Sequence, residues 1–243
     1  MGASVLSEER VIDLFQYRNG VLHCEAVSAA TLVAEYGTPL YVYSESAILE
    51  RYRAFTGAFA ALNPLIAYSV KANGNLAVLR LLADAGAGAD IVSGGELHRA
   101  RLAGMTSDRI VFSGVGKTIT ELAAGLDANI YAFNVESEGE LRMLSDLAVT
   151  MQTRAPIALR VNPDVETHTP HHYTATGHKQ TKFGIPYEEA ERLYHVAARM
   201  PGIIIRGVDV HIGSQILDVE PYRLAVTRVL ELVDRLRASG IDL

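Results

Sequence analysis

The sequence contains very little cysteine and no tryptophan. Its 243 residues include one cysteine, Cys24, so no disulfide can form within the chain and no site built from several thiolates can bind zinc. Proteins of oxidising compartments commonly carry paired cysteines, and this chain does not. The scarcity of cysteine favours a reducing compartment, so we expect the protein to be cytoplasmic.

Long apolar runs and clusters of positive charge are also missing. No stretch approaches the roughly 20 apolar residues that a membrane-spanning helix needs. The first residues, MGASVLSEERVIDLF, lack the basic segment and apolar core of a secretory signal, and Leu6 breaks the myristoylation pattern that Gly2 would begin. The net charge is -6, and no basic stripe stands out. These absences argue against a membrane or a nucleic acid as a partner.

What the sequence does contain is a regular alternation of short apolar runs and amphipathic segments. The hydrophobic share is 49% and the charged share is 21%, the balance of an ordinary globular domain. Apolar and β-branched runs predict strands at 65–72, 88–94, 109–116, 129–137, 156–163 and 202–214. Helical spacing predicts helices at 45–62, 75–86, 94–104, 118–126, 137–149, 186–200 and 220–240. Capping pairs support two of these helix starts, Thr118 with Glu121 and Ser137 with Glu140.

This repeated βα pattern predicts a parallel sheet covered by helices, and two architectures compete for it. An open doubly wound sheet that binds a dinucleotide would carry a glycine-rich fingerprint after a strand, and none is present. The segment SGVGKT at 113–118 has its glycines too close together for a Walker A loop. We therefore expect an α/β fold with a (β/α)8 TIM barrel over residues 44–243, incomplete here with about six βα units.

Residues 1–43 fall outside the repeat. The segments 20–27 and 38–44 have the composition of strands or extended chain, so we expect them to contribute to an accessory β domain. A long polar insert interrupts the repeat at 164–184, and loops of this length in compact domains are usually functional or mobile. Its histidines raise the question of a metal site, but no cysteine accompanies them and their spacing matches no zinc signature, so we expect no metal. These histidines are His168, His171, His172 and His178.

Four of the expected strands carry a charged or titratable residue near the C-terminal end. By alternation, the residues of one strand face are Ala67, Ser69 and Lys71; Gly88, Asp90 and Val92; Ala158, Arg160 and Asn162; and Gly207, Asp209 and His211. Active sites of βα barrels are built at this end of the strands. A lone lysine could simply reach water, but four such side chains at equivalent heights favour a site. A buried amine can attack a carbonyl carbon, and helix N-termini at the same end suit a phosphate.

The chain also contains the segments YSVKANGN, ADIVSGGEL, RVNPDV, HHYTATGHKQTKFGI and VDVHIGSQI. In combination they closely resemble segments of the diaminopimelate decarboxylases, which belong to the alanine-racemase-like, fold type III pyridoxal-phosphate enzymes. The resemblance runs from about Pro39 to the end of the chain. It implies a barrel of the alanine racemase type with a β domain built from both chain ends, which would account for the strands expected in residues 1–43.

The resemblance assigns roles to individual residues. Lys71 matches the lysine that holds pyridoxal 5'-phosphate as a Schiff base, and His211 matches the histidine that stacks on the pyridine ring. Ser214 matches a hydroxyl group that contacts the phosphate, and Arg160 matches an arginine near the ring oxygen of the cofactor. The resemblance thus implies that Lys71 and His211 are catalytic. The cofactor-binding residues that it implies are Lys71, Asp90, Arg160, His211 and Ser214.

Two acidic residues and one short motif complete the match. Asp90 and Glu96 match acidic groups in the polar network near the lysine, and KFGI at 182–185 matches a family signature at the end of the long insert. The reaction implied is the decarboxylation of meso-diaminopimelate to L-lysine, a step of lysine biosynthesis. The resemblance further implies a homodimer for the full-length protein, with sites shared between subunits.

Three other interpretations stay open. The protein could decarboxylate another basic amino acid or a carboxylated polyamine, because the substrate-reading residues of the family have no counterpart in this chain. It could be a non-catalytic pyridoxal-phosphate carrier, although residues 1–43 and the long insert argue against this. It could also be a regulatory homologue, against which the retained Lys71, His211 and Ser214 argue.

The chain ends before all the motifs of the family have appeared. The last residues, 238–243, lie where a seventh strand should begin. The glycine-rich phosphate loop of the family, its glutamate for the pyridine nitrogen, its substrate-binding arginines and tyrosine, and its cysteine motif have no counterpart here. We therefore expect a fragment of a longer enzyme that has two open sheet edges and is inactive or nearly so by itself.

Overall fold

The computed structural model describes residues 14–165 and 183–243. The chain forms two compact units. The N-terminal unit runs to Ile66 and includes residues 84–86, and the barrel unit comprises residues 67–83 and 87–243. Within the described ranges, no helix is both long enough and apolar enough to cross a membrane.

The N-terminal unit combines a small antiparallel sheet with two α-helices. Its elements are β1 (Phe15–Arg18), β2 (Val21–Cys24), β3 (Val27–Ser28), α2 (Ala29–Tyr36), α3 (Glu45–Ala58) and the 3-10 helix η1 (Ala60–Leu62). The strand structure expected at 20–27 is confirmed, whereas 38–44 contains no strand. Ser44 ends that segment because its hydroxyl caps α3, accepting a hydrogen bond from the Ala47 amide, and donates to Glu25 at 2.6 Å.

The barrel unit is built on a parallel sheet whose strands follow one another in chain order. Its strands are β4 (Ala67–Ser69), β5 (Gly88–Ile91), β6 (Ile110–Phe112), β7 (Ala132–Val135), β8 (Ala155–Asn162), the short β9 (Ile185–Pro186) and β10 (Ile203–Asp209). From β5 on, each strand pairs in parallel with the strand before it, except β10, which pairs with β8. The six strands expected from the sequence are confirmed, and in the described residues the sheet has open edges at β4 and β10.

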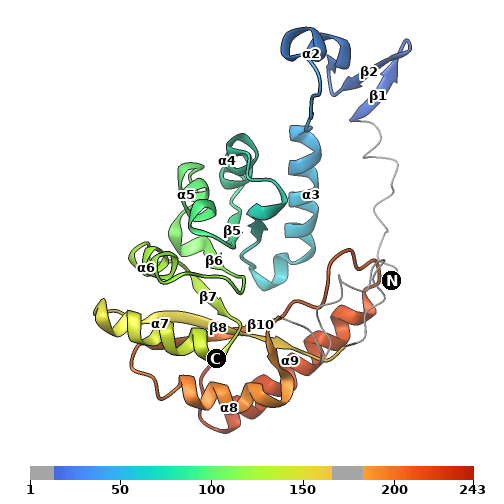
Figure 1. Ribbon diagram of the computed structural model, residues 1–243. Coiled ribbons are helices and arrows are strands. Elements are labelled where there is room, and N and C mark those ends of the chain that lie inside the picture. The colour runs from blue at the N-terminus through green and yellow to red at the C-terminus, as the bar shows by residue number, and fades with distance from the viewer. Residues whose placement is uncertain (1–13, 166–182) are drawn as a thin grey trace. The chain divides into compact units, whose positions relative to one another are not determined.

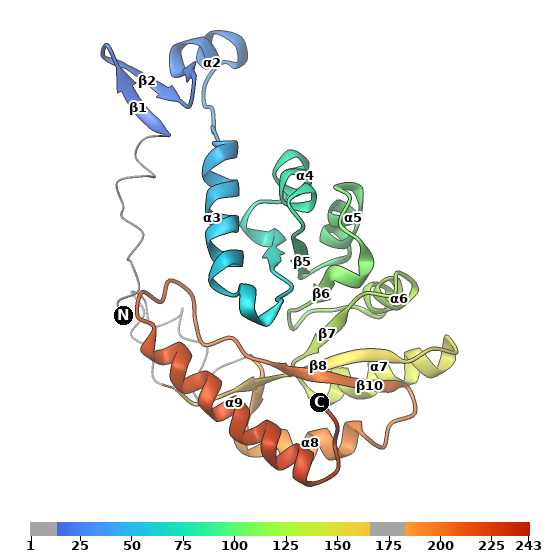
Figure 2. The same cartoon turned by 180° about the vertical axis from the view of Figure 1, so that it is seen from behind.

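A helix follows each of these six strands. The helices are α4 (Leu76–Asp84), α5 (Gly94–Leu102), α6 (Ile119–Asp127), α7 (Glu138–Thr150), α8 (Tyr187–Ala197) and α9 (Glu220–Ala238), with two 3-10 helices, η2 (Val70–Ala72) and η3 (Ser107–Arg109). Figures 1 and 2 show α4 to α8 ranged along one side of the strands. The predicted succession of βα units is therefore confirmed, and it is that of a partial (β/α)8 barrel.

The two faces of the sheet differ sharply in polarity. On the outer face, which the helices cover, the strands present large apolar side chains that are fully buried, including Ile91, Phe112, Phe133, Ile157 and Leu159. Each such side chain contributes roughly 1.5–3 kcal/mol when it leaves water. The alternate residues of the same strands form the inner face, and there the side chains become polar toward the C-terminal ends. Burial of the outer face therefore fixes which residues can line a site.

Hydroxyl caps fix the start of three helices at this same end of the sheet. Ser93, Thr118 and Ser137 cap α5, α6 and α7, and each accepts a hydrogen bond from the backbone of the glutamate three positions later. The capping box predicted at Thr118 with Glu121 is confirmed; at Ser137 the hydroxyl cap forms, whereas the Glu140 carboxylate accepts from the Glu136 amide and from Lys117. The caps place the N-termini of the helices, and therefore their partial positive charge, beside the polar ends of the strands.

Candidate active site

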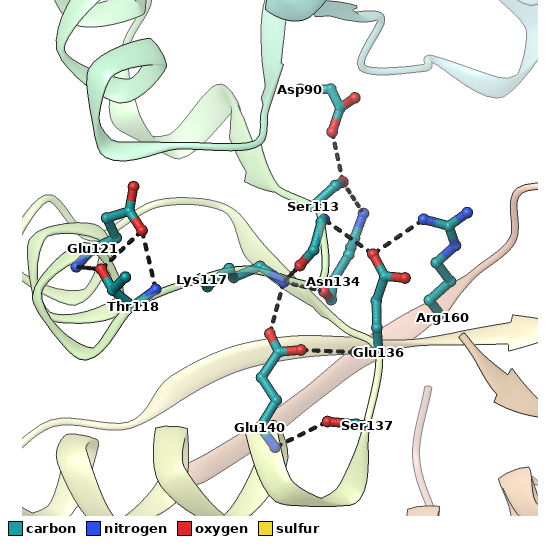
Figure 3. A network of polar contacts seen from close by, with 11 residues as sticks. Asp90, Ser113, Lys117, Thr118, Glu121, Asn134, Glu136, Ser137, Glu140 and Arg160 are labelled. Carbon is teal, nitrogen blue, oxygen red and sulfur yellow. Dashed lines mark hydrogen bonds and ion pairs between the residues drawn. The ribbon is translucent and has the colours of Figure 1, made fainter. Parts of the chain in front are cut away.

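A row of hydrogen bonds crosses the inner face of the first strands, with Asp90 at its centre. The Asp90 carboxylate accepts hydrogen bonds from the hydroxyls of Ser69 at 3.1 Å and Ser113 at 2.6 Å. The side-chain amide of Asn134 donates in turn to the Ser113 oxygen at 3.0 Å. The row therefore joins β4, β5, β7 and the end of β6, as Figure 3 shows for Asp90, Ser113 and Asn134. It holds the carboxylate of Asp90 in one orientation.

Arg160 forms an ion pair that the sequence analysis did not anticipate. Its Nη1 lies 3.1 Å from Oε1 of Glu136, and the two side chains are only 12% and 1% exposed. Glu136 directly follows β7 and also accepts a hydrogen bond from the Gly114 amide at 3.0 Å. The alternation of Ala132, Asn134 and Glu136 was the signal that could have found it. A buried pair of this kind keeps the guanidinium fixed on the inner face.

Two buried atoms of this pair have no hydrogen-bond partner among the residues that the structure describes. They are Nε of Arg160, a donor, and Oε2 of Glu136, an acceptor. Buried polar atoms are almost always satisfied, because an unmade hydrogen bond is costly. A ligand that accepts from Nε and donates to Oε2 would satisfy both atoms.

Lys117 is a second buried charge that the sequence analysis missed. Its Nζ donates to the carbonyls of Gly114 and Asn134 at 2.6 and 2.8 Å and to Oε1 of Glu140 at 2.7 Å. Glu140 accepts the Glu136 amide through its other oxygen at 3.0 Å. Lys117 thus ties the loop after β6 to β7 and α7, as Figure 3 shows. The ammonium of this lysine in the SGVGKT segment therefore donates its hydrogen bonds within the chain, and is not directed at a phosphate as in a phosphate-binding loop.

Lys71 does not lie on a strand. β4 ends at Ser69, and Lys71 is the middle residue of η2. The prediction that it continues the strand face of Ala67 and Ser69 is therefore wrong, because a 3-10 turn repeats every three residues and abandons the two-residue alternation of a strand. Val70 is buried, whereas Lys71 is exposed. The expected buried amine is thus replaced by an accessible one at the end of an edge strand.

His211 lies two residues beyond the end of β10 and is half-buried. Burial lowers the pKa of its imidazole, and the positive charges of Arg160 and Lys71 lower it further, while Asp90 acts in the opposite direction. Arg160, Lys71 and Asp90, the other three residues that the sequence placed at strand ends, therefore all lie within electrostatic reach of His211. Since its pKa is below the ordinary value of 6.5, the His211 ring is predominantly neutral at pH 7.

The other residues of the predicted set have different surroundings. Ser214 is exposed in the loop between β10 and α9. Glu96 accepts a hydrogen bond from the Val92 amide at 2.7 Å, and its own amide donates to the Ser93 hydroxyl at 3.2 Å. Its carboxylate therefore closes the first turn of α5, and it can act on the site through the position of that helix.

The described part of the KFGI motif is anchored to the end of β8. Gly184 has a φ of +77°, and a Cβ atom there would lie 2.7 Å from Oδ1 of Asn162 and 3.1 Å from the Arg160 carbonyl. The Asn162 side chain donates to the Phe183 carbonyl at 2.6 Å, and the Phe183 ring lies 5.8 Å from the Arg160 guanidinium. Only glycine suits this position, so the motif holds the return of the long insert beside Arg160.

The long insert itself is not described between residues 166 and 182, so the four histidines and the first residue of KFGI lie outside the described part of the chain. Elsewhere in residues 14–165 and 183–243, no group of histidine, cysteine, aspartate and glutamate side chains could hold a metal ion.

Asp209 lies opposite Arg160 in the pairing of β10 with β8. Burial raises the pKa of its carboxyl from 3.8 to about 6; Asp90 and Glu136 raise it as well, while Arg160 and Lys117 oppose the rise. The sequence grouped Asp209 with His211 on one strand face but gave it no role. The carboxyl of Asp209 is therefore acted on by two other carboxylates, Asp90 and Glu136, and by two cations, Arg160 and Lys117.

Replacing Asp209 with asparagine is expected to stabilise the protein above pH 6. Because the pKa is higher in the folded state, the stability that this carboxyl contributes is fully present below pH 3.8 and is lost as pH rises through about 6. The loss is at most about 3 kcal/mol. The measurement is urea unfolding of the full-length protein from pH 4 to 8. The free energy of unfolding of the variant, relative to that of the wild type, should increase up to about pH 6 and then stay constant. A difference independent of pH would contradict this expectation.

Comparison with known proteins gives consistent matches along the chain. Residues 45–243 match the family described as "Pyridoxal-dependent decarboxylase, pyridoxal binding domain". A diaminopimelate decarboxylase of Pseudomonas fluorescens is 48% identical over 96% of this chain and 56% of its own length. A crystal structure of diaminopimelate decarboxylase from M. jannaschii with L-lysine has 38% identity and a TM-score of 0.88, covering 95% of this chain and 55% of that one.

A solved structure of lower sequence identity belongs to a different decarboxylase. The lysine decarboxylase of Selenomonas ruminantium is 26% identical, with a TM-score of 0.76 over 88% of this chain and 52% of its own. In all these comparisons, the chain spans about half the length of the relatives that it matches.

Proposed function

Because the chain belongs to the pyridoxal-dependent decarboxylase family, we propose that its full-length protein decarboxylates meso-diaminopimelate to L-lysine with pyridoxal 5'-phosphate as cofactor. The observation that carries this proposal is the 48% identity with a diaminopimelate decarboxylase along 96% of the chain. The identity falls to 26% with a lysine decarboxylase, which favours diaminopimelate over a simple basic amino acid.

The residues on the inner face suit the proposed cofactor. Pyridoxal phosphate presents a carbonyl carbon, an aromatic ring with polar substituents and a phosphate. The exposed amine of Lys71 can reach a carbonyl carbon. The Nε of Arg160, which has no hydrogen-bond partner among the described residues, can donate to a ring substituent. The exposed hydroxyl of Ser214 can donate a hydrogen bond to the phosphate.

The chemistry of the reaction divides between the cofactor and the chain. When bound, the cofactor supplies an electron sink for the pair of electrons released as carbon dioxide leaves. Lys71 provides the nucleophilic amine that holds the cofactor and later releases the product. His211 provides a neutral imidazole that can lie against an aromatic ring without burying a charge. Glu136 holds the Arg160 guanidinium still, which lowers the cost of ordering it around a ligand.

Assembly and location belong to the same proposal. We propose a homodimer for the full-length protein, on the resemblance of the chain to enzymes of that type, and a cytoplasmic location, which the low cysteine content supports. Small-molecule amino acids are the expected partners of the site.

Carbon dioxide release by the full-length protein tests the function directly. With pyridoxal phosphate added, we expect turnover of meso-diaminopimelate with stoichiometric L-lysine, and much slower turnover of L-lysine, L-ornithine and L-arginine. Faster turnover of one of these three would assign the protein to a different decarboxylase. Binding of the cofactor without turnover of any amino acid would instead support a carrier or a regulatory homologue. The 243-residue chain tested alone should have little or no activity.

A further inference from the structure

Strand β10 contains a β-bulge between its apolar beginning and its polar end. Ile205 lies opposite Ile157 of β8, but Gly207 lies opposite the very next residue, Ala158. Arg206 is therefore an extra residue without a counterpart on β8. An extra residue in one strand reverses the face to which all later side chains of that strand point.

The bulge decides the face that Asp209 occupies. Strict alternation would keep Asp209 on the face of Ile203 and Ile205, which is the outer face because Ile205 pairs with the outward-facing Ile157. A ladder without the bulge would bring Asp209 opposite the buried Val161, among apolar side chains. With the bulge, Asp209 lies opposite Arg160 on the inner face. The polar end of β10 is therefore turned inward by one inserted residue.

The bulge also determines the face of the sheet to which His211 points. His211 lies two residues beyond Asp209, so it shares the face of that residue if the extended chain continues. The charges that act on its imidazole include those of Arg160 and Asp90, which lie on the inner face, and that of Lys71, which follows the end of β4. The inward direction of His211 thus depends on the bulge as well.

The hydroxyl of Tyr194 lies where the bulge interrupts the pairing of β8 with β10, and its ring comes from the helix-covered face of the sheet. Tyr194 belongs to α8, its side chain is fully buried, and burial raises the pKa of its hydroxyl, which keeps the proton on the oxygen. The hydroxyl accepts a hydrogen bond from the Leu159 amide at 3.3 Å and donates to the Gly207 carbonyl at 2.7 Å. One hydroxyl therefore bridges a donor on β8 and an acceptor on β10 at the point where the bulge breaks the register.

We propose that Tyr194 is a positioning residue for the candidate active site: its hydroxyl holds the bulge of β10 and so keeps Asp209 and His211 on the inner face with Arg160. Tyr194 lies on the opposite face of the sheet and touches none of the reacting groups. It acts through the backbone of two strands, because a bulge leaves backbone groups that must be satisfied from elsewhere.

The central test is Tyr194→Phe in the full-length protein, which removes the oxygen and keeps the ring. In the protein without cofactor, we expect the Leu159 amide to exchange with solvent about ten-fold faster or more, since its bond is lost. We also expect the NMR titration of the His211 imidazole, assigned with His211→Asn, to move toward its ordinary pKa. With cofactor and meso-diaminopimelate, kcat should fall about 10- to 100-fold with a smaller change in KM.

Tyr187→Phe is the matched control. Tyr187 lies on the same helix, and its hydroxyl donates to the Arg228 carbonyl at 2.8 Å, away from the bulge. This variant should lose stability without any change in Leu159 exchange or in the titration of His211. The proposal is overturned if Tyr194→Phe leaves both of these unchanged, or if Tyr187→Phe changes them equally.

Deleting Arg206 gives a second, independent test. Without the extra residue, Gly207 would follow Ile205 directly and still face Ala158, so β10 would pair continuously and Asp209 would still face Arg160. The deletion should therefore restore the His211 titration in the Tyr194→Phe background. Failure to restore it would show that the hydroxyl does not act through the bulge and would overturn the proposal.

The activity measurement rests on the proposed function, but the exchange and titration measurements do not. If the wild-type protein decarboxylates no amino acid while Tyr194→Phe still changes Leu159 and His211, the function fails and the positioning role stands. If the wild type is active and the variant is indistinguishable from it in all three measurements, the positioning role fails alone.

Discussion

Replacing Lys71 with alanine should reduce carbon dioxide release from meso-diaminopimelate on the order of 10⁴-fold, the scale of losing an essential nucleophile. The amine is the group that would attack the carbonyl carbon of the cofactor, and its exposure on η2 leaves it accessible. Full-length wild type and variant would be compared by carbon dioxide release. Borohydride treatment followed by peptide mass spectrometry would then locate the covalently bound cofactor.

Lys71→Arg separates nucleophilicity from charge. Arginine keeps the positive charge near His211 but stays protonated and does not attack carbonyl carbons. We expect Lys71→Arg to be as inactive as Lys71→Ala while preserving more of the effect of that charge on the titration of His211. Cofactor trapped at Lys117, or full activity in either variant, would refute the assignment of Lys71.

Replacing Glu140 with glutamine should destabilise the full-length protein by about 3–5 kcal/mol. The change leaves the ammonium of Lys117 buried, with its side chain 1% exposed and its 2.7 Å charge partner gone. Two carbonyls would still accept from Lys117, but they carry no compensating charge. The measurement is urea unfolding monitored by circular dichroism. The dependence of the unfolding free energy on urea concentration should be the same in all variants compared.

Two further variants make this expectation specific. Arg142→Ala removes an exposed ion pair with Glu138 on the same helix and should cost far less stability, because solvent screens exposed pairs. The double variant Lys117→Met with Glu140→Gln should be more stable than the sum of the two single changes predicts, because no unpaired charge remains. An equal cost for Glu140→Gln and Arg142→Ala would show that the buried pair contributes little.

The repeat of strands and helices was readable from the sequence because each element is specified locally. Apolar runs such as 155–162 fill β8, and capping hydroxyls mark the starts of α6 and α7. Lys71 shows where local patterns stop being sufficient. The strand predicted at 65–72 ends at Ser69, three residues early, and a 3-10 turn that contains Lys71 replaces the alternation of a strand.

The charged part of the site could be predicted only in part, because its partners are distant in sequence. Glu136 was visible at the end of β7, but its pairing with Arg160 spans two strands. Lys117 belongs to a segment that looks like a phosphate loop, and its ion pair with Glu140 forms only when β6 and β7 are neighbours. The bulge in β10 breaks the alternation itself, and the interior glycine at 207 was its one signal in the sequence.

The strand order of the barrel unit has a consequence for how the protein is made. Every strand after β4 pairs with a strand already present when it leaves the ribosome, and none of these pairings waits for a distant part of the chain. Synthesis proceeds slowly enough for such units to add one by one, from the N-terminal side. At each stage the newest strand offers an unpaired edge, and a stalled or shortened product would keep that edge exposed. We therefore expect growing chains of this protein to need chaperone protection most at whichever strand was added last.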